Sequence, residues 1–369
     1  MKDYGGESGL DTYKQPSWLR KYRTALILLA VLFLLFYAYI KPWPYMLYGP
    51  GSAEPVHPRV ETGHELEEKG ALLFTTVSTY SNPNIFSILY ARFNPRMEVK
   101  SEETATGGAT NLTAYRNLLS YMRDSSEANA LLAAYTTMGK PIDVQPQGVI
   151  VVTLLPESKA RENGLQEGDI ITKVDDQDVP SAKELSDYLT GKKSGDEVKV
   201  SGTRGKEKFE TTVPLITMAP DNRTGIGFRN ETVLKVTAPD PVKFDFADTG
   251  GPSAGLMMTL EIIAQLTGED LTRGYRIAGT GTISADGTVG LIGGINYKLM
   301  AADRENADYF LVPYSEQNES NWTLAQETVD KLKLKPKLVK VSTLQEAVEF
   351  LKKLEPKPDE PDGKLKEKG

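Results

Sequence analysis

The feature that most constrains this chain is an uninterrupted apolar and aromatic stretch near its N-terminus, Thr24–Ile40. As an α-helix it would be roughly 25 Å long, just short of the hydrocarbon core of a bilayer. Tyr22 before it and Trp43–Tyr48 after it can extend it as interfacial anchors. We therefore predict a single transmembrane helix over residues 21–41.

The charges beside this stretch predict its orientation. Only Lys41 follows it closely, whereas several cations precede it: Lys14, Arg20, Lys21 and Arg23. The positive-inside rule places a tail, residues 1–20, in the cytoplasm and everything after Tyr48 outside the cell membrane. The alternative is a cleaved signal peptide, with a faint small-residue site at Gly51-Ser-Ala53, although the apolar stretch is longer than a usual h-region. Under either interpretation, most of the chain lies outside the cytoplasm.

A second feature is the glycine-rich stretch Asp248–Gly255. Within it, Ser253 has the pattern G-x-S-x-G, which places a serine hydroxyl on a tight turn leading into a helix. The following apolar residues recur at helical spacing: Leu256, Met257, Leu260, Ile263 and Ala264. The alternative is that Ser253 is only an N-cap, although Leu256 stands where a capping box would have Glu or Gln.

A nucleophilic serine needs a base, and the histidines of this chain do not supply one. His57 and His64 both lie far upstream, whereas an α/β-hydrolase has its acid and then its histidine after the serine. The known variant without histidine is Ser-Lys. Lys298 is the best candidate, because the glycines at 293–294 followed by Asn296 predict an N-cap and put Lys298 in the first helical turn.

That position favours a neutral lysine amine. The N-terminus of a helix is partly positive, and burial disfavours an ammonium as well. A lysine whose pKa falls to roughly 7–8 can act as a general base. The alternative is an ordinary surface lysine, as most lysines are; only the serine motif favours the catalytic interpretation of Lys298.

Three motifs in order carry a family resemblance, which covers residues from about 225 to 354. They are Gly251-Pro-Ser-Ala-Gly255, Thr280-Gly-Thr-Ile-Ser284 and Gly293-Gly-Ile-Asn-Tyr-Lys-Leu-Met-Ala-Ala302. With these motifs the region closely resembles the proteolytic domain of the Lon family. The resemblance implies that Ser253 is the nucleophile, that Lys298 is its base, and that Thr280 forms a hydrogen bond near the lysine.

Further expectations follow from the resemblance. Backbone N–H groups of the turn around Gly250, Gly251 and Pro252 would stabilise an oxyanion, since a helix N-terminus supplies oriented donors. Tyr297 stands where cytoplasmic members of the family usually carry an acid. The whole arrangement looks most like the membrane-anchored, PDZ-containing Lon-like proteases of Gram-positive bacteria (the YlbL type). Members of the Lon family often form hexameric rings, so a homo-oligomer is expected.

Residues 144–217 have the pattern of a separate β-rich unit. Two stretches, Leu154–Ser158 and Gly164–Ile171, resemble a bacterial PDZ domain. Such domains add a peptide as an extra strand and hold its carboxylate on backbone N–H groups. The expected peptide groove includes Gly148, Val149, Ile150 and Val151. The alternative is a β-rich spacer that binds no ligand, because a fold alone does not prove binding.

The remaining segments complete a multidomain organisation. Residues 42–70 are rich in proline and glycine and predict a linker. Residues 71–143, with a strand at Ala71–Val77 and helical stretches after it, are expected to pack with the protease domain. That domain, residues 225–354, alternates strands with helices and predicts an α/β or α+β layered core. Residues 355–369 predict a solvated charged tail.

Composition excludes several classes of function. The net charge of −7 gives no electrostatic support to nucleic-acid binding. The chain has no cysteine and two histidines, so thiolate catalysis and cysteine- or histidine-rich metal sites are not expected. It also has no Walker A motif, and we expect neither metal nor cofactor. The predicted function is a membrane-anchored, ATP-independent serine endopeptidase acting on peptides or small proteins. The alternative is an inactive PDZ adaptor at the membrane.

Overall fold

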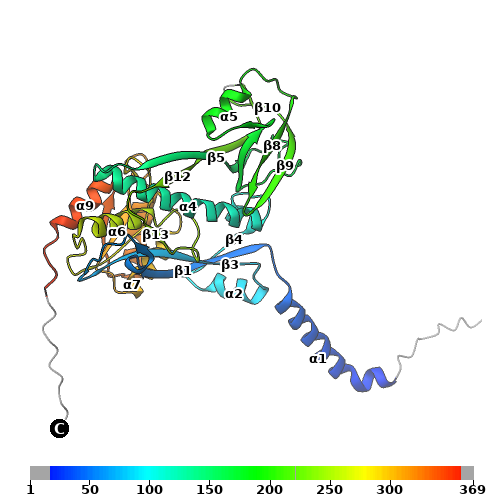
Figure 1. Ribbon diagram of the computed structural model, residues 1–369. Helices are drawn as coiled ribbons and strands as arrows, with labels where there is room; N and C mark the ends of the chain where they lie inside the picture. Colours follow the sequence, from blue (N-terminus) through cyan, green and yellow to red (C-terminus); the bar gives the residue numbers. More distant parts are fainter. Residues whose placement is uncertain (1–16, 221, 359–369) are drawn as a thin grey trace, which may run out of the picture.

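The computed structural model describes residues 17–220 and 222–358 (Figure 1). Nearly all of the predicted cytoplasmic tail, and the charged tail beyond residue 358, therefore lie outside the described residues. The first element, helix α1 (Ser17–Ile40), extends away from the rest of the molecule. Its part from Lys21 to Ile40 has a mean hydropathy of 2.2 and is not buried against other elements. The helix is long and apolar enough to cross a membrane, as an N-terminal signal sequence can also be.

The centre of the molecule is a six-stranded mixed sheet in the order β18-β17-β14-β3-β1-β4. Strand β3 pairs antiparallel with β1, which also pairs with β4, and parallel with β14 on its other edge. Strand β17 continues the parallel half between β14 and β18. The bounds are β1 Tyr45–Pro55, β3 Ala71–Ser81, β4 Glu98–Ser101, β14 Arg276–Gly279, β17 Tyr309–Pro313 and β18 Lys337–Val341.

Helices cover both faces of this sheet, which confirms the predicted α/β class. Along β3, Leu72 and Phe74 pack into one cluster with helices α4, α6 and α9. Their neighbours Ala71 and Leu73 pack into a second cluster with α7 and α8. This alternation follows from the two-residue repeat of a strand. The helices are α4 Leu112–Thr137, α6 Gly255–Thr267, α7 Ile295–Arg304, α8 Ser320–Leu332 and α9 Leu344–Lys353.

The predicted linker over 42–70 is wrong for the residues of β1. This strand pairs with β3 from Met46↔Ser81 to Pro55↔Leu73, with a register shift between Pro50 and Ala53. A β-bulge accommodates the glycine and proline residues that suggested a linker. The segment after β1 is also anchored, because Val56 and Val60 are buried in the main core.

A second sheet, in the order β12-β5-β6-β8-β9, forms the β-rich unit. Its core includes Val149, Ile171, Val200 and Leu185, the last from helix α5. The bounds are β5 Asp143–Leu154, β6 Asp169–Val174, α5 Ala182–Leu189, β8 Glu197–Arg204, β9 Glu207–Pro214 and β12 Phe228–Thr237. In Figure 1 the end of this unit with β8, β9 and α5 stands apart from the central sheet, and β5 and β12 extend from that end toward the rest of the molecule.

The structure corrects the predicted boundary between the two domains. The protease domain predicted over residues 225–354 includes β12, but β12 pairs with β5 along its whole length, from Phe228↔Leu154 to Thr237↔Asp143. The β-rich unit is thus inserted between two parts of the helix-covered layer. The chain before the unit contributes β3 and the chain after it contributes β14, and these two strands pair in one sheet.

Short elements complete the described chain. Strands β15 and β16 form a short hairpin, in which Ile283 pairs with Val289. The other short pairs are β2 with β13 and β10 with β11, while β7 pairs with β6. The bounds are η1 His57–Arg59, β2 Val60–Glu61, α2 Ile85–Phe93, α3 Glu102–Thr106, β7 Gln177–Asp178, β10 Ile216–Met218, β11 Arg223–Gly225, β13 Lys243–Phe244, β15 Thr282–Ile283 and β16 Val289–Gly290.

Candidate active site

Ser253 lies on the turn that leads into α6. The helix begins at Gly255, and its N-cap residue is Ala254, with no side-chain capping hydrogen bond. The alternative interpretation of Ser253 as an N-cap is therefore wrong. A Cβ at Gly255 would come within 2.8 Å of Ser126 Oγ and 2.9 Å of the Ile283 side chain. Glycine at this position lets the start of the helix approach α4 and β15 closely.

Lys298 reaches the serine from a different helix. Helix α7 begins at Ile295 after Gly294, which has a φ of 72°. The N-cap predicted at Asn296 is thus displaced by two residues, and Lys298 still lies in the first turn. Its side chain crosses to Ser253, where Nζ lies 2.8 Å from Oγ.

Burial gives this lysine an unusual pKa. Lys298 is only 3% exposed, and desolvation lowers the pKa of its amine from 10.5 to about 7. Burial disfavours the charged ammonium because the interior solvates ions poorly. A neutral amine retains a lone pair that can accept the hydroxyl proton of Ser253. This value lies close to the range of roughly 7–8 in which a lysine can act as a general base.

A third group completes the surroundings of the amine. Lys298 Nζ donates a hydrogen bond to the backbone carbonyl oxygen of Thr75 on β3, at 2.7 Å. With one donor bond to Thr75, a neutral amine is oriented so that its lone pair is free for Ser253. Sequence reasoning did not identify Thr75, because its side chain takes no part in this contact.

Thr280 contacts the serine rather than the lysine. Its hydroxyl donates to the carbonyl oxygen of Ser253 at 2.9 Å, and the N–H of Gly281 donates to the same oxygen at 2.9 Å. The resemblance implied a hydrogen bond near Lys298. The structure instead gives Thr280 the role of fixing the backbone of the nucleophile.

The expected oxyanion donors need correction. The N–H of Gly251 already donates to the carbonyl oxygen of Leu119 at 2.9 Å, and Pro252 has no N–H to offer. Within residues 17–220 and 222–358, the N–H groups of Gly250, Ser253 and Ala254 have no hydrogen-bond acceptor. Those of Ser253 and Ala254 lie directly beside the hydroxyl, at the start of α6.

An ion pair supports the loop that carries the serine. Arg59 donates to Asp248 Oδ1 at 2.7 Å and to the carbonyl oxygen of Asp245 at 2.9 Å. The hydrogen bond from Arg59 lowers the pKa of Asp248. Asp248 is therefore a structural partner of η1, and the amine of Lys298 has no carboxylate among its hydrogen-bond partners in the described structure.

The predicted peptide groove is closed by the chain itself. Residues Gly148, Val149, Ile150 and Val151 lie on β5, where β12 pairs with all four and β6 pairs with the middle two. Helix α5 packs against both β5 and β12, and the N–H of Ala182 donates to Thr232 Oγ1 at 3.0 Å. Both edges of β5 are therefore paired at the residues of the expected groove.

One cluster has side chains of the kinds that bind metals. His57, Glu68 and Glu261 bring one ligand atom each within 4.8 Å of one another. Glu261 Oε1 accepts from Gln265 at 2.7 Å and lies 2.8 Å from His57 Nδ1, whereas Oε2 has no partner. Burial, and secondarily the charge of Glu261, raises the pKa of Glu68 to about 8. The raised pKa favours a proton on Glu68 at neutral pH.

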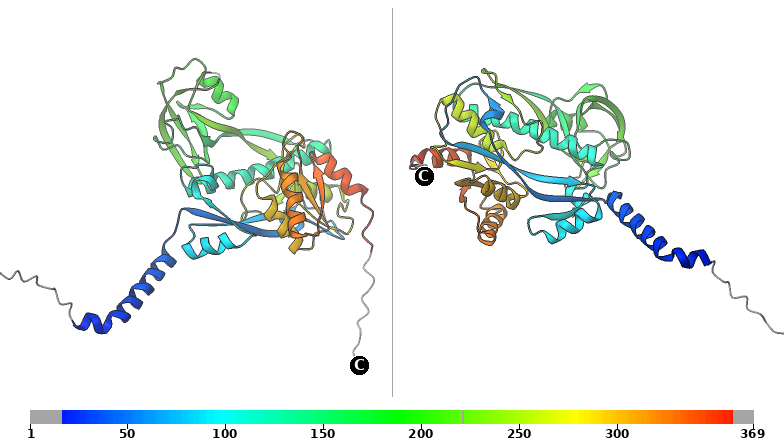
Figure 2. Two further views of the ribbon diagram at one scale, coloured as in Figure 1. Left: turned by 180° about the vertical axis from the view of Figure 1, so that it is seen from behind. Right: turned by 90° about the horizontal axis from the view of Figure 1, so that it is seen from below.

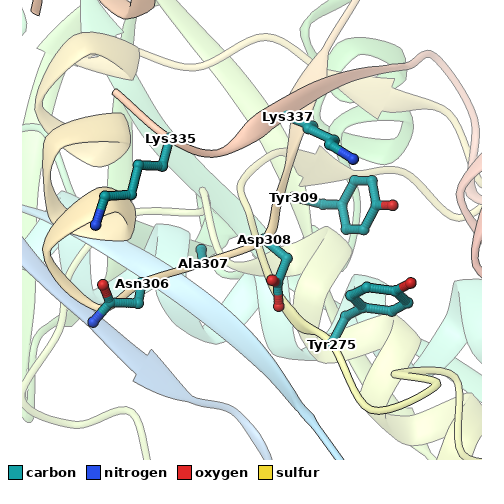
Figure 3. A pocket seen from close by; sticks show the side chains of 7 residues that line it. All are labelled: Tyr275, Asn306, Ala307, Asp308, Tyr309, Lys335 and Lys337. Carbon is teal, nitrogen blue, oxygen red and sulfur yellow. The ribbon is translucent and has the colours of Figure 1, made fainter. Parts of the chain in front are cut away.

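The pocket in Figure 3 is separate from the dyad, the pair formed by Ser253 and Lys298. It is lined by Tyr275, Asn306, Ala307, Asp308, Tyr309, Lys335 and Lys337. These residues lie at or just before the starts of β14, β17 and β18, whereas Thr280 follows the end of β14. The Asp308 carboxylate is paired with Lys357 at 2.8 Å. We assign no chemistry to this pocket.

Two family models match the chain. One is described as the PDZ domain and matches residues 120–215; the other is the Lon protease (S16) C-terminal proteolytic domain and matches residues 246–352. The second range includes Ser253, Thr280 and Lys298. It does not include Thr75 and Leu119, which lie before the inserted unit. Strand β12 falls between the two matched ranges.

Curated relatives point the same way. The chain is 27% identical to a Lon protease of Neorickettsia sennetsu over 163 residues, covering 44% of this chain and 19% of that protein. It is 30% identical to a Lon protease of Buchnera aphidicola over 121 residues, covering 33% and 15%. The chain thus spans less than a fifth of the length of these relatives.

Solved structures match the inserted unit. The PDZ domain of an SdrC-like protein from Listeria monocytogenes is 30% identical, covering 23% of this chain and 87% of that chain, with a TM-score of 0.22. The corresponding domain from Listeria innocua is 33% identical, covering 23% and 93%, with a TM-score of 0.22. These scores carry no argument about arrangement, so the family model alone supports the assignment of this unit.

Proposed function

Because the chain combines a Lon-type proteolytic domain with a PDZ domain, we propose that it is a serine endopeptidase working through Ser253 and Lys298. The observation that carries the proposal is the 2.8 Å contact between Lys298 Nζ and Ser253 Oγ at a buried amine. Its substrates would be peptides or small, flexible proteins. With no Walker A motif in the sequence, ATP-driven unfolding of stable substrates is not part of the proposal.

The proposed chemistry uses the amine as a proton carrier. Lys298 takes the hydroxyl proton as Ser253 Oγ attacks the peptide carbonyl carbon, and the carbonyl oxygen becomes an oxyanion. Collapse of this intermediate breaks the C–N bond, and Lys298 gives the proton to the leaving amine. Water then loses a proton to Lys298 and attacks the acyl ester, and Ser253 Oγ leaves with that proton.

We assign the oxyanion donors to the backbone N–H groups of Ser253 and Ala254. Both groups lack an acceptor among the described residues and lie at the N-terminus of α6, where the helix dipole also favours negative charge. Thr280 and Gly281 hold the carbonyl oxygen of Ser253 and so orient these donors.

We propose that most of the chain lies on the outer side of the cell membrane. The apolar part of α1, Lys21–Ile40, would anchor the chain, and the cations before it would keep the N-terminus in the cytoplasm. Both domains would then face the exterior. A homo-hexameric ring stays a prediction from the resemblance to the Lon family.

We propose that the PDZ domain acts by gating rather than by recruiting substrates. Strand β12 occupies the edge of β5 that a peptide would use. The same strand leads through β13 to the Asp245–Asp248 loop that Arg59 holds and then to Ser253. A peptide that displaced β12 would therefore loosen the serine turn. An inactive adaptor would need an open groove, so the occupied edge favours the enzyme over that alternative.

The test is cleavage of an unstructured peptide by full-length protein in detergent, followed by mass spectrometry. Wild type should cleave the peptide, and Ser253→Ala and Lys298→Ala should lose cleavage while keeping the wild-type circular dichroism spectrum. His64→Ala is a matched control, because His64 is exposed and takes no part in the site. Full activity in Lys298→Ala would reject the dyad.

A further inference from the structure

Helix α2 (Ile85–Phe93) carries an apolar stripe that faces outward. Phe86, Leu89, Tyr90 and Phe93 recur at the spacing of one helical face, which in a globular protein ordinarily packs against the core. Here these side chains are 43%, 47%, 66% and 84% exposed. An exposed aromatic and aliphatic stripe of this kind marks an interaction surface.

The stripe lies next to the end of α1. Three residues after Ile40, the N–H of Trp43 donates to the carbonyl oxygen of Pro83 at 3.0 Å, and Pro83 directly precedes Asn84, the N-cap of α2. Helices α1 and α2 also contact each other. Figures 1 and 2 show α2 beside the end of α1 from each direction. The start of α2 is therefore fixed close to the point where the apolar helix ends.

The surroundings of α2 are typical of a membrane–water interface. Tyr80, at the end of β3, is 57% exposed, and Lys41 lies 4.8 Å from the ring centre of Trp43. Arg92 and Arg96 are exposed at the C-terminal end of the helix. Aromatic rings and cations of this kind favour the headgroup region, and the cations attract anionic lipids.

We propose that the exposed face of α2 lies in the outer membrane–water interface and seats the protease domain against the bilayer. This inference rests on the proposed anchoring by α1. A second copy of the chain is the other possible occupant of the stripe. The bilayer is favoured because the hydrogen bond between Trp43 and Pro83 holds the start of α2 at the end of the apolar helix. Attachment at two points would limit the protease to substrate segments near the membrane surface.

The absence of cysteine allows a site-specific test in the full-length protein. Three single-cysteine variants, Phe93→Cys, Leu32→Cys and Lys183→Cys, would be labelled with the environment-sensitive dye NBD. They would be placed in phosphatidylcholine–phosphatidylglycerol vesicles with or without doxyl-labelled lipids. Leu32 reports on the anchor, and Lys183 on α5, at the end of the molecule away from α1, is 80% exposed.

The inference predicts blue-shifted emission from position 93 and its quenching by doxyl lipids, with position 183 unquenched. Blue-shifted emission that doxyl lipids do not quench would indicate contact between protein copies and would overturn the inference. Water-like emission at 93 with quenching at 32 would overturn it while leaving the anchor intact. Loss of quenching at both positions would reject the anchor and, with it, the seating of α2.

Discussion

The Nζ atom of Lys298 lies 2.7 Å from the backbone carbonyl oxygen of Thr75, a residue 223 positions earlier in the chain. This contact links the second half of the central layer to the first half, across the inserted PDZ domain. It directs the amine toward Ser253 without adding a charge. The lysine thus stays in an environment that favours its neutral form, which is the property the proposed mechanism requires.

The first prediction concerns the pH dependence of cleavage. Burial lowers the pKa of Lys298 to about 7, and the proposed base is the unprotonated amine. The kcat/KM of peptide cleavage should therefore rise about tenfold per pH unit below pH 7 and level off above it. A pH profile of the full-length enzyme measures this. A rate that is flat from pH 5 to pH 9 would show that no such group controls the reaction.

The second prediction concerns Thr280 as a positioning residue. Replacing it in Thr280→Val removes the hydrogen bond to the carbonyl oxygen of Ser253 but leaves the burial of Lys298 unchanged. We expect kcat to fall by about 10- to 100-fold, comparable to the loss of a well-placed group. The midpoint of the pH profile should stay in place, and Thr280→Ser should restore most of the rate. A shifted midpoint would mean that Thr280 acts on the lysine instead.

The third prediction concerns stability and Glu68. Burial and the nearby Glu261 raise the pKa of Glu68 from an ordinary 4.5 to about 8 in the folded protein. The unfolded chain therefore releases this proton at lower pH than the folded chain. The free energy of unfolding should fall as pH rises from about 4.5 to about 8. In Glu68→Gln this decrease should be smaller, as thermal unfolding at several pH values would measure.

A matched variant separates this effect from the general titration of the protein. Glu65→Gln changes the same kind of residue at an exposed position three residues earlier. It should leave the pH dependence as in wild type. If Glu68→Gln and wild type lost stability equally over this pH range, Glu68 would not be the buried acid described here.

The fourth prediction separates gating from recruitment by the PDZ domain. Thr153 on β5 faces Arg229 on β12 in the strand register, at a separation that suits a disulfide. The double variant Thr153→Cys, Arg229→Cys should form a disulfide that locks β12 in place. Ser253 and Lys298 are in contact in the structure in which β12 pairs with β5. The oxidised enzyme should therefore retain full activity on an unstructured peptide. Activity that disappears on oxidation and returns on reduction would support recruitment through this edge.

The nucleophile and the base could be predicted from the sequence because their motifs are local. Ser253 and Lys298 each lie in a short pattern whose residue types and order restrict the chemistry. Their shared environment could not be predicted in this way. Every residue has a backbone carbonyl, so the contact between Lys298 and Thr75 leaves no mark in the sequence. The N–H of Gly251 was likewise expected to be free, because its acceptor at Leu119 is distant in the chain.

The strands show a similar limit. The predicted protease domain included β12, but alternation of side chains does not identify the partner of a strand, and β12 pairs with β5 outside that domain. Proline and glycine in β1 predicted a linker, since a bulge and a loop share these residues. In both cases long-range pairing decided the structure. The helix α1 was predictable because a long apolar run needs no partner within the chain.

Covalent labelling of Ser253 tests directly whether Lys298 activates this serine. Full-length protein at pH 8 would be treated with a fluorophosphonate, and the modified residue would be mapped by mass spectrometry in wild type and in Lys298→Met. Ser253 should be modified in wild type and not in Lys298→Met, with both proteins folded. Equal modification in the two proteins, or none at Ser253 in folded wild type, would contradict activation of the serine by the buried lysine.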